Sequence, residues 1–205
     1  MYELFLNNNS EDKKLDVSDN DLIENVDIET KALFSECGGC SFNKGLYRVH
    51  TPNSSVHWSI IISKYFPKYD SKIIPFGYDW LGRQYVVDSS REDCILMFDP
   101  ATAEDFGLKK SLRSFHNDDL VHDRNNVLAE SAFCSVINQL GLNRIAYDNC
   151  VSHKVSLFLG GNDDINNYEI CDVEVNWEFQ FQIYLQIRDL PPGTKINSVK
   201  VKYPK

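Results

Sequence analysis

No stretch of the sequence stays apolar for the roughly 18 residues that a membrane-spanning helix requires. Residues 1–9 have neither a basic start nor a long apolar centre, so they do not look like a secretory signal. We therefore expect a cytoplasmic protein without a membrane partner. In that compartment, six cysteines scattered among apolar neighbours are expected to be reduced and buried and not to form a disulfide framework.

Positive charge is scarce, because 21 Lys and Arg residues stand against 30 Asp and Glu residues and give a net charge of −9. Residues 1–30 hold nine of the acids and only two lysines, whereas the rest of the chain is nearly neutral. A nucleic-acid-binding protein needs a basic surface against the phosphates, so no nucleic-acid partner is expected. An acidic, flexible arm over residues 1–20 could steer association with a basic protein or simply aid solubility.

Motifs of catalysis are also missing. There is no Gly-x-Ser-x-Gly turn, and the pair Gly160-Gly161 lacks the lysine of a phosphate-binding loop. Cys37 and Cys40 form a Cys-x-x-Cys pair, but it follows an expected helix, whereas a reactive thiol is favoured at a helix N-terminus. His116 and His122 lack the i, i+4 spacing of a helical metal site. The sequence thus predicts a structural turn at the cysteines, no metal and no cofactor.

Enough apolar sequence is present to form a core, at 42% of 205 residues. Alternating apolar residues predict a meander of antiparallel strands between residues 73 and 108, with a hairpin joining residues 84–87 to residues 94–98. Helical periodicity, caps and breakers predict helices over residues 22–34, 54–65, 123–140 and 177–188. Further short strands are expected at residues 46–50, 154–159, 168–173 and 196–201.

These elements predict an α+β fold, with a central, mostly antiparallel meander sheet that helices pack against. We divide the chain into the acidic arm (residues 1–20), a main α+β domain (residues 21–145) and a C-terminal β-β-α-β segment (residues 146–205) that packs on the same core. Trp58, Trp80 and Trp177 are expected to be buried anchors of that core.

The most distinctive stretch is Pro-Phe-Gly-Tyr-Asp-Trp-Leu-Gly-Arg-Gln at residues 75–84. Other short pieces accompany it, at residues 37–40, 45–50, 99–102, 114–121, 157–161 and 190–194. In this order they resemble bacterial immunity proteins of the SUKH superfamily, and related type VI secretion immunity proteins with a GAD-like N-terminal part. The resemblance covers most of the chain from about residue 30 onward.

This resemblance implies an α+β protein without catalytic activity that binds a cognate toxin, encoded nearby, and blocks its active site stoichiometrically. A nuclease would suit an acidic inhibitor, because its substrate-binding cleft is basic. The protein itself would be a monomer or a weak homodimer. Two alternatives remain open: a regulatory or scaffold module of the same fold that binds another protein, and a thiol or metal enzyme whose cysteines and histidines converge in one pocket.

If the protein is an inhibitor, acidic residues near its turns are candidates for the contact surface, with an aromatic anchor among them. The candidates are Tyr78, Asp79, Glu104, Asp105, Asp163 and Asp164. Asp163 and Asp164 also lie in an Asn-rich stretch that could offer oxygen ligands to calcium, but the spacing fits a turn better.

Overall fold

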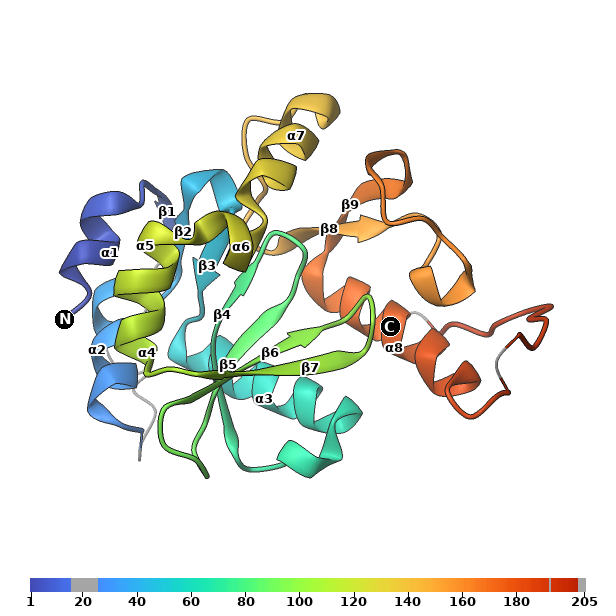
Figure 1. Ribbon diagram of the computed structural model, residues 1–205, viewed down its shortest axis with the longest axis horizontal. Coiled ribbons are helices and arrows are strands. Elements are labelled where there is room, and N and C mark those ends of the chain that lie inside the picture. The colour runs from blue at the N-terminus through green and yellow to red at the C-terminus, as the bar shows by residue number, and fades with distance from the viewer. Residues whose placement is uncertain (16–25, 192, 203–205) are drawn as a thin grey trace.

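The computed structural model describes residues 1–15, 26–191 and 193–202, and its centre is a seven-stranded sheet (Figure 1). Its strands lie in the order of the sequence, and each pairs with the next in antiparallel orientation. They are β1 (Glu11–Lys14), β2 (Cys40–Phe42), β3 (Tyr47–Val49), β4 (Ile73–Asp79), β5 (Gln84–Asp88), β6 (Cys94–Asp99) and β7 (Glu104–Lys109). A separate antiparallel pair is formed by β8 (Asn149–His153) and β9 (Tyr168–Asp172). The predicted α+β fold with an antiparallel meander is confirmed.

Helices cover both faces of the sheet (Figure 1). The longer ones are α1 (Glu3–Asn8), α2 (Ile28–Cys37), α3 (Pro52–Tyr65), α6 (Arg124–Leu128), α7 (Glu130–Leu140) and α8 (Val173–Ile187). Single turns occur at α4 (Leu112–Ser114), α5 (Leu120–His122), η1 (Asn43–Gly45), η2 (Pro67–Tyr69), η3 (Phe115–Asp119), η4 (Leu157–Leu159) and η5 (Ile165–Asn167). Helix α3 begins at a capping box, because Thr51 and Ser54 exchange side-chain-to-backbone hydrogen bonds of 3.0 Å.

Successive residues of the sheet point into two separate apolar cores, as the two-residue period of a strand requires. On β5, Tyr85 lies in a first core shared with α1, α2 and α7, and Val86 lies in a second core shared with α3 and α8. A β-bulge between Pro75 and Gly77 shifts the register of β4. Because of this shift, Phe76 packs in the first core whereas Tyr78 packs in the second.

The expected flexible arm is wrong for residues 1–15, which form α1 and β1 and pack on the first core. Tyr2, which directly precedes α1, and Phe5, in the first turn of that helix, are both fully buried. The amino group of Met1 forms an ion pair of 2.8 Å with Glu36. Residues 16–20 of the expected arm lie outside the described residues. The acidic N-terminal sequence is thus in large part structural.

The C-terminal segment also differs from the expectation. The strand expected at residues 154–159 is displaced to β8, and residues 157–159 form a 3₁₀ turn. No strand forms in the described residues 193–202, so the β-β-α-β segment is β-β-α followed by an extended tail. The helix expected at residues 123–140 is interrupted at Ala129, whose φ of +53° is left-handed. Trp177 and Phe181 of α8 lie in the second core.

Candidate protein-binding pocket

The distinctive Tyr-Asp-Trp-Leu-Gly-Arg motif builds the turn between β4 and β5. The fully buried Asp79 carboxylate accepts hydrogen bonds from the backbone N–H groups of Leu81 (3.0 Å) and Arg83 (3.1 Å), and its other oxygen lies 2.5 Å from the Arg83 guanidinium. The Trp80 indole donates to the carbonyl of Leu128 at 2.7 Å. Each polar group of the motif is therefore engaged inside the protein, and the motif organises the fold.

Tyr78 and Asp79 are wrong as candidate contact residues. Tyr78 is 2% exposed, and its hydroxyl donates to the carbonyl of Tyr147. The guanidinium of the fully buried Arg48 lies 5.3 Å from the centre of the Tyr78 ring. Both side chains are buried, so a partner could reach neither of them without opening the interior of the protein. Trp58, Trp80 and Trp177, by contrast, are buried as expected.

The other four candidate acids lie near the surface but at two different places. Glu104 and Asp105 begin β7, and the Asp105 carboxylate accepts hydrogen bonds from Lys68 at 2.9 Å and from Tyr69 at 2.5 Å. Asp163 lies in the loop between η4 and η5, where it accepts hydrogen bonds from Tyr168 at 2.6 Å and from His153 at 3.1 Å.

Asp164 caps the following turn through the N–H of Asn166 at 2.9 Å. No hydrogen bond or ion pair among the described residues joins the β7 pair to the pair in the η4–η5 loop. The structure does not test whether either pair contacts a partner, so these four residues stay predictions.

The buried histidines are tied into the core. Burial lowers the pKa of both His50 and His116 to about 4, so both are neutral at pH 7. His116 donates from Nδ1 to the carbonyl of Leu112 at 2.9 Å, and its Nε2 lies 3.0 Å from the Tyr47 hydroxyl. No group of three or more His, Cys, Asp or Glu side chains is arranged to hold a metal ion in the part of the chain that the structure describes.

Cys37 and Cys40 lie at a turn, where α2 ends and β2 begins. Burial raises the pKa of both thiols to about 12. At neutral pH both are therefore protonated thiols, which are weak nucleophiles. Their position at the C-terminal end of α2 is the end at which the helix dipole disfavours a thiolate.

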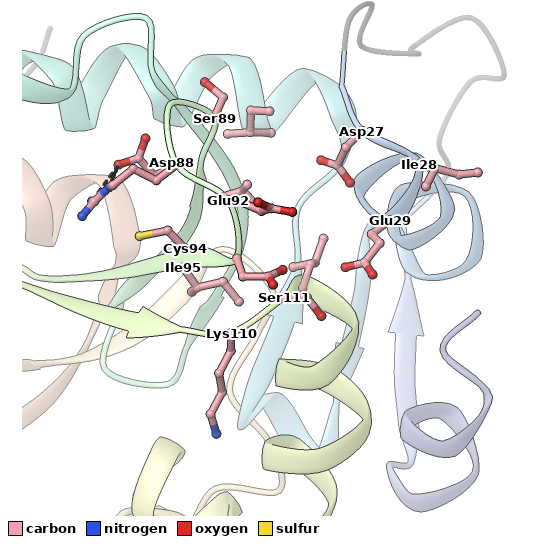
Figure 2. Close-up of a pocket in the computed structure, with 15 residues that line it drawn as sticks. Asp27, Ile28, Glu29, Asp88, Ser89, Glu92, Cys94, Ile95, Lys110 and Ser111 are labelled. Atoms are coloured by element: carbon pink, nitrogen blue, oxygen red, sulfur yellow. Dashed lines mark hydrogen bonds and ion pairs between the residues drawn. The ribbon is translucent and has the colours of Figure 1, made fainter.

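A pocket of about 470 Å³ lies where the beginning of α2, the beginning of β4, the end of β5, the β5–β6 turn and the beginning of α4 meet (Figure 2). We call it the acidic pocket. Its apolar lining comes from the sheet and its flanking helices: Ile28, Ile74, Val87, Ile95 and Leu112. Five carboxylates line it, Asp27, Glu29, Asp88, Glu92 and Asp93, against two basic side chains, Arg91 and Lys110. The pocket therefore combines an apolar wall with an excess of negative charge.

Several of these charges are held in place by bonds within the protein. Asp27 caps α2 through the N–H of Thr30 at 2.9 Å, and Glu29 accepts from the N–H of Arg113 at 2.9 Å. Burial alone would raise the pKa of Asp88, but hydrogen bonds from Ser90 and an ion pair of 2.7 Å with Arg91 lower it.

Lys110 is paired with Asp119, away from the centre of the pocket (Figure 2). Both Glu92 and Asp93 are exposed, and neither side chain forms a hydrogen bond or ion pair with a described residue. These two carboxylates are therefore available to a ligand.

The sequence reasoning missed the acidic pocket. A local signal existed in the turn Asp88-Ser89-Ser90-Arg91-Glu92-Asp93, which holds three acids in six residues. The other half of the pocket, Asp27 and Glu29, lies some sixty residues earlier in the sequence, and no local pattern connects the two halves.

Comparison with known proteins adds information about the fold. No family model matches the sequence, and no curated protein matches it. Among solved structures, the chain is similar to Atu4351 from Agrobacterium tumefaciens, with a TM-score of 0.68 at 15% sequence identity over 89% of both chains. This likeness shows a shared fold across nearly the whole length. No helix among the described residues has the length and hydropathy needed to cross a bilayer.

Proposed function

We propose that this protein is an immunity protein that binds a cognate bacterial toxin and blocks its active site stoichiometrically, without chemistry of its own. The observation that carries the proposal is the acidic pocket, in which exposed carboxylates surround an apolar wall. The sequence resemblance to SUKH-type immunity proteins points to the same function.

A basic loop of the toxin is the ligand that such a pocket fits. The aliphatic stem of a Lys or Arg side chain can pack on Ile74, Val87 and Leu112 while its charged end meets Glu92 or Asp93. Nuclease active sites carry such basic residues, because they hold phosphates. An inhibitor that places carboxylates there competes with the substrate, and its long-range field raises the rate of encounter.

The test begins with the product of the neighbouring open reading frame, which is co-expressed with this protein and used in a pull-down. The double variant Glu92→Lys with Asp93→Lys reverses charge in the acidic pocket, and Glu169→Lys with Asp189→Lys makes the same change in charge at exposed sites elsewhere. Exposed ion pairs contribute about 0.2–1 kcal/mol each, so we expect the pocket variant to bind roughly two- to thirtyfold more weakly at low salt.

At high salt the difference between the two variants should shrink, because the charges are screened. Failure of the neighbouring gene product to bind would contradict the immunity function. Binding that the pocket and control variants weaken equally would retain the function and remove the acidic pocket as its site.

A further inference from the structure

The tail that follows α8 is held by two glutamine side chains. The Gln182 amide accepts from the N–H of Lys202 at 2.7 Å and donates to the carbonyl of the same residue at 2.9 Å. One helical turn later, the Gln186 amide makes the same two bonds with Lys200, both at 3.0 Å. The tail thus returns to α8 and runs antiparallel to it (Figure 1).

This pattern fixes the conformation of the tail. The N–H and C=O of one residue point to the same side only in an extended chain, and successive residues alternate between the two sides. The backbone N–H and C=O groups of Lys200 and Lys202 point towards α8. The backbone groups of Val199 and Val201 therefore point away from it. No described residue forms a hydrogen bond with these outward N–H and C=O groups. The glutamines therefore act like a neighbouring strand on one edge of the tail, and no described residue pairs with its other edge.

A groove of about 430 Å³, lined by both apolar and polar residues, lies beside this tail. Its apolar lining comes from η4 and from the tail itself: Phe158, Leu159, Ile196 and Val199. Leu159 is 36% exposed, and a side chain entering the groove would cover it. An added strand would thus find both backbone partners and an apolar contact in one place.

The charge of the tail restricts what can pair with it. Residues 190–205 contain four lysines and no acid, in a chain whose net charge is −9. Lys200 and Lys202 are exposed. A second copy of the same tail would bring lysines opposite lysines, which is unfavourable across a strand pair, whereas Glu or Asp there would be favourable.

From this geometry we propose that the outer edge of residues 199–201 is a docking site for an extended segment of another protein, in which acidic and apolar residues alternate. The segment adds a strand to the tail, so that its backbone pairs with Val199 and Val201 and its acidic side chains lie beside Lys200 and Lys202. This site is separate from the acidic pocket and does not depend on the immunity function.

The test uses the full chain and a fluorescently labelled peptide of alternating Glu and Val, followed by fluorescence anisotropy. Val201→Pro removes one outward N–H and leaves both residues bound by the glutamines intact, since a residue before proline favours the extended conformation that Lys200 already has. Val201→Thr is the matched control that retains the N–H. We expect at least a tenfold loss of affinity for Val201→Pro, a change of less than twofold for Val201→Thr, and at least fivefold weaker binding of a Lys–Val peptide.

The proposal is overturned if the Glu–Val peptide does not bind, or if Val201→Pro binds it as well as the unchanged protein does. Ultracentrifugation of the unchanged protein provides a second measurement. A concentration-dependent dimer that Val201→Pro abolishes would assign the edge to a second copy of this chain and would also contradict the proposal.

Discussion

Acidification should destabilise this protein well before its carboxylates titrate, because two histidines are buried in neutral form. Burial lowers the pKa of His50 and His116 to about 4, against 6.5 for an exposed histidine. As pH falls below 6.5, the unfolded chain takes up protons at these two positions and the folded chain does not. Their contribution to stability is therefore complete above pH 6.5 and is lost as the pH falls towards 4.

The size of the effect follows from the shifts. Each histidine should lower the free energy of unfolding by about 1.4 kcal/mol per pH unit within this window. Two histidines should then cost about 3 kcal/mol between pH 6.5 and pH 5, because the slope is only about half as steep at pH 6.5, and this is a large part of the stability of a typical domain. Burial raises the pKa of Asp99, and this group acts in the opposite direction, because its protonation favours the folded state.

Urea unfolding followed by tryptophan fluorescence at pH 7, 6 and 5 measures this loss. The variant His116→Gln should be less stable at pH 7, because it loses the bond to Leu112 or the bond to Tyr47. Its loss of stability per pH unit between pH 6.5 and 5 should nevertheless be about half that of the unchanged protein. Equal slopes in the two proteins, or unchanged stability from pH 7 to pH 5, would refute the reasoning.

Three further predictions concern packing and thiol accessibility. Gly77→Ala should lower the free energy of unfolding by about 1–3 kcal/mol or more in urea titrations, because the added methyl would clash with the Tyr47 hydroxyl and lie 2.6 Å from the Arg48 carbonyl oxygen. A neutral result would contradict this close approach of β3 to β4. Trp177→Ala should cost about 3–5 kcal/mol in the same assay, since the fully buried indole fills the second core, and a loss below 1 kcal/mol would contradict that placement. Under native conditions Cys134 should react with a thiol reagent while Cys150 reacts only on unfolding, and mass spectrometry of the labelled peptides would detect the reverse order.

The meander could be predicted from sequence because its determinants are local. Strands β5 and β6 are short apolar stretches separated by a turn, and each has its ends within one residue of the expected ranges 84–87 and 94–98. Strand β7 ends at Lys109, one residue beyond the expected end of the meander. Helix α7 ends at Leu140, where the helix expected over residues 123–140 also ends, because the C-cap residue Gly141 acts within its own turn.

Other features depended on contacts between distant residues. Nothing local distinguishes a solvated acidic terminus from one that buries Tyr2 and Phe5 against His116. Tyr78 lies in a turn-like sequence that suggests exposure, but the β-bulge directs it into the second core. Residues 196–201 alternate apolar and polar side chains, as a strand does. The backbone of this tail is nevertheless bonded by two glutamine side chains of α8 and not by another strand, and strand propensity does not predict such a partner. The acidic pocket escaped prediction for the same reason.

The consecutive order of the seven strands has a consequence for synthesis on the ribosome. Each strand can pair with the preceding strand as soon as it leaves the ribosome, because its partner has already been synthesised. Proteins whose contacts are local in sequence also fold quickly. The second core, to which α3 contributes Trp58 and Ile62, forms later. It also needs residues of α8, and that helix begins only at Val173. A nascent chain stopped before that residue should expose an aromatic surface that promotes aggregation, and synthesis of α8 is the step that covers this surface.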